Sequence, residues 1–261
     1  GYGQHAAGTI ISGDKLPDIL PLKCNKDNEN YETQCTMAQA ENKGLLKMDF
    51  LGLENLDILT ELEIKTKDYI ITDYSKRQEL LNNKEVLRDI FSTALTQGIF
   101  QFESNGMKQM LKDFRPDSFE DIILLVSAYR PGPMQFLPEI IQTKQYRDGR
   151  CKEAPEHSIN IDNDSLKRIL DPTYGCIIYQ EQVMQICTDV AGFTMGHADN
   201  VRKYVSKKKE TKLAEEREDF IDGCRDRSGI SEQDANDLFD KMTDFARYAF
   251  NKSHATCYAL V

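Results

Sequence analysis

The chain has 261 residues, of which 40% are hydrophobic and 29% are charged, and its formal net charge is -10. This composition is typical of a globular protein with a buried core, and the acidic balance means that any nucleic-acid binding must come from a local basic patch. No apolar run reaches the roughly 20 residues that a membrane-spanning helix needs.

The seven cysteines are scattered and include no C-x-x-C pair. Such a set argues against a disulfide framework or a structural zinc site and favours a reducing compartment, so we expect a cytoplasmic protein.

The chain opens on GYGQHAAGTII, with neither an initiator Met nor a cap, and closes on HATCYALV, which has the pattern of a helix without a final Gly, Pro or polar tail. We therefore expect it to be a piece of a longer protein.

The first 54 residues predict a small region that contains β-strands. Residues 7–12 are β-branched and bounded by glycine, and residues 45–53, LLKMDFLGL, form a second apolar run. Both are predicted strands, and the polar stretch 24–35 between them is a predicted hairpin-like loop. From residue 55 onward apolar residues recur mainly at helical spacing, so we expect an α+β fold with two domains, residues 1–54 and residues 55–261.

Several segments of the second domain have predicted boundaries. Ser118, with Asp121 three residues later, predicts a capped helix that ends before the two prolines of RPGPM. The remaining predictions are a mixed segment at 136–150 with a turn at RDGR, a loop at 155–165, helices at 181–191 and 197–205, a helix from Ser231 with an apolar stripe, and, for CIIYQ at 176–180, either a short strand or the start of a helix.

Lys47 and Asp49 form the first candidate site. Side chains alternate along a strand, so Leu46, Met48 and Phe50 are expected to line a core face and Lys47 and Asp49 the opposite face. A carboxylate placed this way is the ligand type that Mg²⁺ takes in two-metal phosphoryl transfer, and the lysine would meet a phosphate or balance the carboxylate. The alternative, which this stretch alone favours, is the solvated outer face of an amphipathic strand.

The stretch RKYVSKKK at 202–209 is the second candidate, with five basic residues out of eight. On one continuous helix Arg202 would align with Lys209, and Lys203 with Lys207, giving a basic face suited to a triphosphate or a nucleic-acid backbone. The alternative is a solvated charged face that pairs with the acidic run EEREDF just downstream.

The stretch RYAFNKSHATCYAL at 247–260 is the third candidate. Asn251, His254 and Tyr258 share one face of a helix, and Lys252 adds a cation. Such a face suits the phosphates and sugar of a nucleotide, whereas the alternative is ordinary helix surface on which His254 is satisfied locally.

Weaker signals come from single residues. Arg130 precedes a rigid turn, which would fix a guanidinium at a site, although an ordinary surface arginine in a structural loop fits equally well. His5 has no nearby histidine or cysteine, so a structural role is expected. The sequence has no P-loop, no G-x-G-x-x-G loop, no H-E-x-x-H pair and no visible catalytic triad, which excludes the commonest enzyme classes.

The chain resembles one family, the alpha subunit of bacterial DNA polymerase III, which is the C-family of replicative DNA polymerases. The resemblance runs essentially from end to end and rests, in chain order, on QHAAGTIIS, LLKMDFLGL, FQFES-x-GM, DSFEDIILLVSAYRPGPM, DPTYGCIIYQEQVMQI, SKKK and FNKSHATCYALV. It implies that residues 1–54 are the C-terminal part of a nucleotidyltransferase-type palm and that residues 55–261 are the first part of mainly helical fingers.

The resemblance also implies residue roles. Family members hold two Mg²⁺ ions with three aspartates; Asp49 matches the third of these and Lys47 the basic residue beside it, while the P-D-x-D-x-D-F motif of the other two is not in the chain. Lys203 stands where the family often has an arginine, which costs a bidentate phosphate contact. The candidate dNTP-binding residues are Arg202, Lys203, Lys207, Lys208, Lys209, Asn251, Lys252 and His254, together with Arg130.

By this resemblance the parent protein adds dNTPs to a primer 3′-hydroxyl on a DNA template by two-metal nucleotidyl transfer. Its partners would be primer–template DNA and dNTP, and it would reach a sliding clamp and a clamp-loader subunit through regions that this chain lacks. The chain alone is expected to be inactive because it carries one of the three metal carboxylates. The rival interpretation is a non-catalytic helical module that binds nucleic acid or a partner protein.

Overall fold

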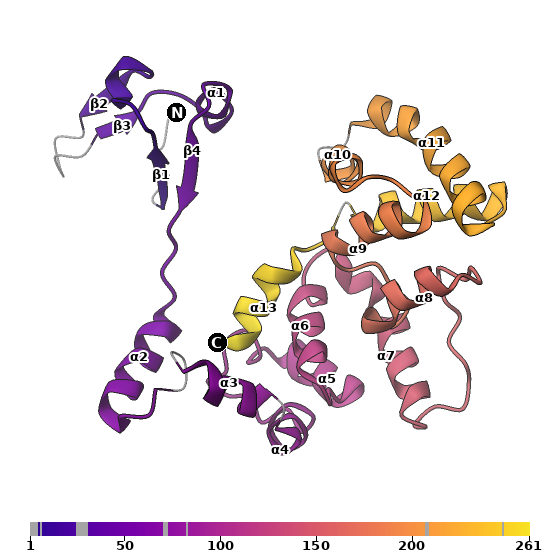
Figure 1. Cartoon of the computed structure of the whole chain (residues 1–261). Coiled ribbons are helices and arrows are strands. Elements are labelled where there is room, and N and C mark those ends of the chain that lie inside the picture. The colour runs from indigo at the N-terminus through magenta and orange to yellow at the C-terminus, as the bar shows by residue number, and fades with distance from the viewer. Residues whose placement is uncertain are drawn as a thin grey trace. The chain divides into compact units, whose positions relative to one another are not determined.

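A computed structural model describes residues 5, 7–24, 31–69, 73–81, 83–206, 209–246 and 248–261 (Figure 1). Within these ranges, short strands occur only before residue 50 and helices dominate the remainder, which confirms the predicted α+β fold. The chain divides into two units, residues 1–65 and residues 66–261. No helix among the described residues is long and apolar enough to cross a membrane.

The first unit contains two antiparallel strand pairs. The strand β1 pairs with β4, and β2 pairs with β3. The elements in chain order are β1 (Gly8–Ile11), the 3-10 turn η1 (Leu16–Asp18), β2 (Leu22–Cys24), β3 (Tyr31–Thr33), α1 (Met37–Asn42), β4 (Leu46–Asp49) and α2 (Glu54–Thr66). Both predicted strands are confirmed. The polar stretch 24–35, predicted as a hairpin-like loop, includes Cys24 of β2 and the whole of the paired strand β3, while residues 25–30 lie outside the described residues.

The apolar side of β4 is not a core face, so this prediction is wrong. Leu46 is 58% exposed, Met48 is 40% exposed and Phe50 is 64% exposed, whereas the Lys47 side chain is only 15% exposed. Alternation predicted correctly which residues share a side, but it cannot say which side another layer covers. The buried cluster of this unit instead consists of Leu20, Ala40 and Leu45.

The second unit is helical and has one hydrophobic core, to which most of its helices contribute. Its elements are α3 (Tyr74–Leu81), α4 (Lys84–Val86), η2 (Leu87–Phe91), α5 (Asn105–Phe114), α6 (Phe119–Ala128), η3 (Pro133–Phe136), α7 (Leu137–Arg147), α8 (Asp164–Leu170), η4 (Asp171–Thr173), α9 (Gln180–Gln185), η5 (Ile186–Val190), α10 (Met195–Ser206), α11 (Glu210–Ser228), α12 (Glu232–Ala246) and α13 (Lys252–Leu260). The proposed boundary between palm and fingers at residue 54 coincides with the start of α2 and stays a prediction.

Local sequence signals fix several of these helices. Ser118 Oγ accepts the Asp121 backbone N–H at 3.2 Å, and the Asp121 carboxylate accepts the Ser118 N–H at 3.3 Å, which confirms the predicted capping box of α6. Ser231 Oγ likewise accepts the Asp234 N–H at 3.1 Å at the start of α12. The apolar stripe of α12 is buried over Ala235, Leu238, Phe239, Met242 and Phe245.

Two segments differ from or refine the predictions. The segment expected to be mixed at 136–150 is a regular helix, α7, followed by the predicted turn, because the proline in its first turn needs no N–H partner there. The CIIYQ stretch makes a single parallel bridge, Tyr179 with Phe250, and then enters α9.

Candidate functional site

Asp49 lies at the end of β4 beside two nitrogen-bearing side chains. Lys47 Nζ lies 2.7 Å from Asp49 Oδ1, and His5 Nδ1 lies 3.7 Å from the same oxygen. Gly8 faces them from β1, where a Cβ atom would lie only 2.7 Å from Lys47 Cε. Glycine at this position therefore lets the lysine lie against the β1 backbone. The neighbourhood of His5 and Asp49 was missed because it depends on the pairing of β1 with β4.

The electrostatics at this point favour an ionised carboxylate. The hydrogen bond from Lys47 holds the pKa of Asp49 below its usual range, and the charges of Lys47 and His5 act in the same direction. An ionised carboxylate is a hard oxygen ligand that suits Mg²⁺. Asp49 nevertheless belongs to no group of three potential metal ligands within the described ranges. The residues present fit one ligand of a metal site rather than a complete one.

The basic residues of α10 are held by an acid on the same helix. Asp199 Oδ1 accepts hydrogen bonds from Arg202 Nε at 2.9 Å and Nη2 at 2.7 Å, and Asp199 Oδ2 lies 2.6 Å from Lys203 Nζ. Lys203 and Arg202 lower the pKa of Asp199 through these hydrogen bonds. One carboxylate thus serves two cations, which leaves a local positive charge. Arg202 and Lys203 therefore pair with Asp199, which precedes them in the chain. The alternative of a solvated charged face predicted pairing with the acidic run EEREDF, which follows them.

The rest of the basic stretch does not continue along one helix. The helix α10 ends at Ser206, and Lys209 occupies the N-cap position of α11. The Lys209 backbone N–H donates to Tyr204 O at 2.9 Å, and its ammonium lies 6.0 Å from the centroid of the Tyr204 ring. The predicted alignment of Arg202 with Lys209 is therefore wrong. Lys207 and Lys208 lie outside the described residues.

The start of α13 is tied to two other helices. Asn251 caps α13, since its Oδ1 accepts the His254 N–H at 2.8 Å, while its Nδ2 donates to Glu181 Oε1 at 3.1 Å. Lys252 Nζ lies 2.7 Å from Glu120 Oε2 on α6. Asn251 and Lys252 therefore join α13 to α9 and α6, and Figure 1 shows α13 beside α6.

The exposed side of α13 carries a row of rings. The His254 ring lies 4.5 Å from the Tyr258 ring and 5.3 Å from the Phe250 ring, measured between centroids. Tyr258 in turn lies 5.5 Å from Phe100. This places His254 and Tyr258 on one face, as predicted. Partly exposed rings in a row are suited to stacking against a nucleobase.

Arg130 is fixed by the segment that precedes α13. Its Nε donates to Ser127 O at 2.8 Å, its Nη2 donates to Tyr248 O, and its Cζ lies 4.3 Å from the centroid of the Phe250 ring. Burial lowers the pKa of the guanidinium. The turn that follows depends on Gly132, which has φ +102° and would place a Cβ 2.4 Å from the Tyr248 ring. Arg130 is thus held in one orientation by these contacts, and its role at a binding site stays a prediction.

Three predicted stretches meet at the bridge between Tyr179 and Phe250. The Gln180 N–H donates to Phe250 O at 2.9 Å, and Arg202 Nη1 donates to Gln180 Oε1 at 3.2 Å. Because Arg130 covers Phe250 and Asn251 follows it, residues far apart in the sequence gather around one short backbone contact. We call this arrangement the bridge site. No sequence pattern predicted it.

One other cluster has metal-ligand chemistry. His197 on α10 and Glu216 and Asp219 on α11 bring their ligand atoms within 4.8 Å of one another. His197 is hydrogen-bonded directly to Glu216, and its ring stacks on Phe193 with the centroids 4.0 Å apart. These contacts account for the cluster as a link between two helices. Sequence spacing does not predict the cluster, because its members lie on different helices.

Comparisons with known proteins cover the whole chain. Residues 55–228 match the bacterial DNA polymerase III alpha subunit finger domain, and residues 1–52 match the bacterial DNA polymerase III alpha NTPase domain. The chain is similar to the DNA polymerase III alpha subunits of Borreliella burgdorferi, Bacillus subtilis and Thermus aquaticus, with 39% identity over 257 residues, 40% over 259 and 39% over 259. These alignments cover 98% of this chain and 21%, 22% and 20% of the relatives, so the chain spans about a fifth of their length.

Proposed function

Since the chain belongs to the bacterial DNA polymerase III alpha subunit family, we propose that it forms the end of the palm and the first part of the fingers of a replicative DNA polymerase. The reaction is the template-directed addition of dNTPs to a primer 3′-hydroxyl. The bridge site binds the triphosphate of the incoming nucleotide. The observation that carries this proposal is the convergence of Arg130, Arg202 and the start of α13 on the bridge between Tyr179 and Phe250.

The bridge site has the charge and rigidity that a triphosphate needs. Arg202 and Lys203 share Asp199 as their acidic partner, so a phosphate oxygen can approach two cations that are only half neutralised. A guanidinium presents its donors in a planar fork that matches phosphate geometry, and Arg202 is already oriented by Gln180. Lys209 and the neighbouring Lys207 and Lys208 extend the positive charge along the chain. His254 and Tyr258 supply rings for the base or sugar.

Asp49 is proposed as a metal ligand of the palm, with Mg²⁺ as the ion and the other two aspartates in a part of the parent protein outside this chain. Such an ion, when bound, stabilises negative charge on phosphoryl oxygens. Within this chain, Lys47 keeps Asp49 ionised and fixes the direction of its carboxylate. The chain by itself is proposed to be inactive, because it offers one of the three aspartates that the family uses.

The partners proposed for the parent protein are primer–template DNA, dNTP and, through regions outside this chain, a sliding clamp and a clamp-loader subunit. Its proposed compartment is the cytoplasm. These assignments rest on family membership and on the cysteine content of the sequence.

A nucleotide titration tests the bridge site. Fluorescent dTTP is titrated into the wild-type chain, into Arg202→Gln, and into a control, Arg225→Gln, which removes one charge from α11. Binding is expected to weaken about tenfold in Arg202→Gln, the size of a lost charge-assisted hydrogen bond, and to stay unchanged in the control. If Arg202→Gln binds dTTP normally but loses affinity for DNA or for a partner protein, the non-catalytic docking module is the correct interpretation.

A primer-extension assay tests the proposed inactivity. The purified chain is incubated with primer–template, dNTPs and Mg²⁺, and no incorporation is expected. Mg²⁺-dependent extension by the chain alone would show that the missing carboxylates are not required.

A further inference from the structure

A second basic feature of the helical unit uses none of the residues of the bridge site. It is an open cleft of about 770 Å³ whose walls come from the segment around α4, the loop between α5 and α6, and the turn after α7. Four cationic side chains line it: Lys84, Arg88, Arg115 and Arg150. We call it the basic cleft. In a chain of net charge -10 such a concentration of positive charge is local.

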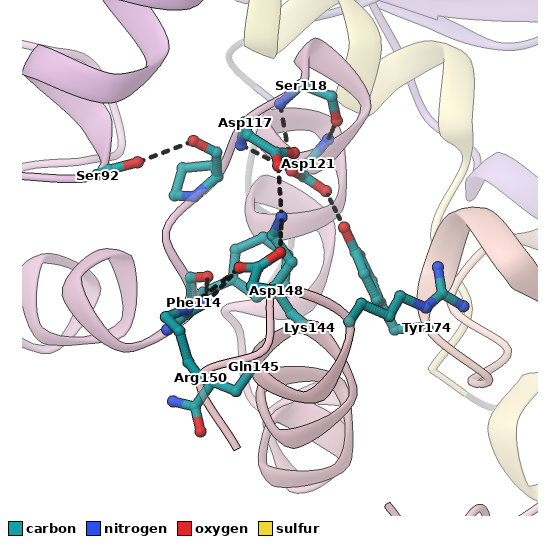
Figure 2. A network of polar contacts seen from close by, with 12 residues as sticks. Ser92, Phe114, Asp117, Ser118, Asp121, Lys144, Gln145, Asp148, Arg150 and Tyr174 are labelled. Carbon is teal, nitrogen blue, oxygen red and sulfur yellow. Dashed lines mark hydrogen bonds and ion pairs between the residues drawn. The ribbon is translucent and has the colours of Figure 1, made fainter. Parts of the chain in front are cut away.

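Hydrogen bonds hold the walls of the basic cleft together. Ser92 Oγ donates to Pro116 O at 2.9 Å, which joins the α4 segment to the loop after α5. The Arg150 guanidinium donates to Asp113 O at 2.8 Å and to Phe114 O at 2.6 Å, which joins the turn after α7 to the end of α5 (Figure 2). The cleft is therefore largely preorganised.

The acidic residues in the lining are already paired from the interior side. Lys144 Nζ lies 2.8 Å from Asp117 Oδ2 and 3.0 Å from Asp148 Oδ1, and the Lys144 side chain is only 4% exposed. Figure 2 shows this ammonium between the two carboxylates. One ammonium neutralises only one of these two carboxylates, but Asp148 also pairs with Arg150, whose Nη2 lies 2.8 Å from Asp148 Oδ2. Because Arg88 is likewise paired with Asp89, the positive charge that remains at the cleft comes from Lys84 and Arg115.

Two of the four lining cations are free for a ligand. Within the described parts of the chain, the side chains of Lys84 and Arg115 form no ion pair or hydrogen bond, and both are exposed. Arg115 moreover has φ +59° at the C-cap of α5, a left-handed conformation that glycine or asparagine adopts more easily. Arg115 thus carries a positive charge at a backbone position where glycine is usually favoured, which is consistent with a function for that charge.

We propose that the basic cleft binds the phosphodiester backbone of a nucleic acid, independently of base sequence. Cations from three segments around an open cleft suit a row of phosphates better than a small enclosed ligand. Among the described residues that line the cleft none is aromatic, so we expect contacts to phosphate rather than stacking on bases. This site is separate from the proposed triphosphate site, since the two share no residue.

The test uses the full chain and a matched pair of double variants. Lys84→Gln/Arg115→Gln removes the two free cations, and Lys212→Gln/Arg225→Gln removes the same charge from α11, which contributes nothing to the cleft. Fluorescence anisotropy with a labelled 20-nucleotide dT strand, and with the corresponding duplex, is measured over a series of salt concentrations. For the cleft variant we expect about tenfold weaker binding at low salt. We also expect the slope of the logarithm of the binding constant against the logarithm of the salt concentration to decrease in magnitude by roughly one to two.

The two outcomes separate this proposal from the previous one. Unchanged dTTP binding by the cleft variant, together with weakened oligonucleotide binding, supports the basic cleft whatever the fate of the bridge site. Equal losses in both double variants would reduce the effect to net charge and overturn the proposal, as would wild-type affinity in the cleft variant. Binding of inorganic tripolyphosphate to the wild-type cleft without binding of either oligonucleotide would also overturn it. Thermal melts check the fold, and Lys84→Gln alone replaces the double variant if the change at Arg115 disturbs α5.

Discussion

The carboxylate of Glu181 lies at the N-terminus of α13, where its two oxygens lie 3.1 Å and 3.0 Å from the Lys252 backbone nitrogen and accept its N–H. Backbone N–H groups at a helix start lack partners within the helix, and the helix dipole favours an anion there. Glu181 therefore already fills the place where a phosphate would bind through the backbone. The Lys252 N–H at the start of α13 is therefore not free for a phosphate. Under the proposed function, the triphosphate charge would be met by Arg202 and Lys203.

We predict that Glu181→Gln destabilises the helical unit by about 1 kcal/mol, because it removes the charge from hydrogen bonds at a helix N-terminus. Urea unfolding followed by circular dichroism measures the change. The control is Glu120→Gln, whose partner is the partly exposed ammonium of Lys252, and its expected effect is below about 0.5 kcal/mol. Equal effects of the two substitutions would contradict the assignment of Glu181 as the main anchor of α13.

Arg130 gives a second prediction. Its guanidinium donates to Ser127 O and to Tyr248 O and covers the Phe250 ring. A lysine has one compact ammonium and cannot reproduce this planar fork, so Arg130→Lys should cost about 1–2 kcal/mol of stability. Arg225→Lys on the surface of α11 is the control and should leave stability unchanged. A lysine variant as stable as the wild type would show that Arg130 does not hold the bridge site together.

The third prediction concerns the buried pair shown in Figure 2, in which the Tyr174 hydroxyl donates to Asp121 Oδ1 at 2.7 Å. Tyr174→Phe removes a donor from a buried carboxylate and should cost about 1–3 kcal/mol at neutral pH. Tyr146→Phe, on the exposed side of α7, is the control and should have little effect.

The pH dependence of this loss has a definite sign. Burial raises the pKa of Asp121, against the hydrogen bonds that it accepts. A carboxyl whose folded pKa lies above its unfolded value, about 3.9, contributes fully below the unfolded value and contributes less as the pH rises through the folded value. Loss of the Tyr174 hydroxyl raises the folded pKa further. The destabilisation by Tyr174→Phe should therefore be larger at pH 7 than at pH 4, and a pH-independent loss would contradict this account.

The sequence predicted those features that depend on neighbours a few residues apart. The capping box of Ser118 and Asp121 and the buried stripe of α12 follow from spacing within one helix, and both are confirmed. The helix predicted at 197–205 matches α10, which ends at Ser206, whereas the alignment of Arg202 with Lys209 on one continuous helix was wrong, because a run of basic residues has no stop signal of its own.

Sequence patterns did not predict the contacts between segments that lie far apart in the chain. Arg202 with Gln180, and Glu181 with Lys252, join helices whose approach is decided by the core beneath them. The prediction that the apolar side of β4 is buried was wrong for a related reason. Alternation defines the two sides of a strand, and only packing decides which side is buried. The family resemblance predicted roles for single residues such as Arg202 and Lys252, whereas the distances between them follow from the fold.

The last prediction concerns Lys47 and the acidity of Asp49. Lys47→Gln removes the hydrogen bond and the charge that hold the pKa of Asp49 below its usual range, so the pKa should rise toward about 3.9. Because the folded pKa is depressed, the stabilisation from this pair is present above the unfolded value and disappears as the pH falls through the folded value. The stabilities of the wild type and the variant should therefore converge in acid. Carboxyl NMR over a pH series measures the shift.

Asp162 is the internal control for this titration, since its pKa is lowered by a hydrogen bond from Lys167 and should not change. An unchanged Asp49 titration in Lys47→Gln would show that His5 and solvent, rather than Lys47, set the state of the carboxylate. Lys47 would then be free to contact a phosphate, whereas a clear rise would show that its charge is already committed to Asp49. The same measurement thus distinguishes the two tasks that the sequence left open for this lysine.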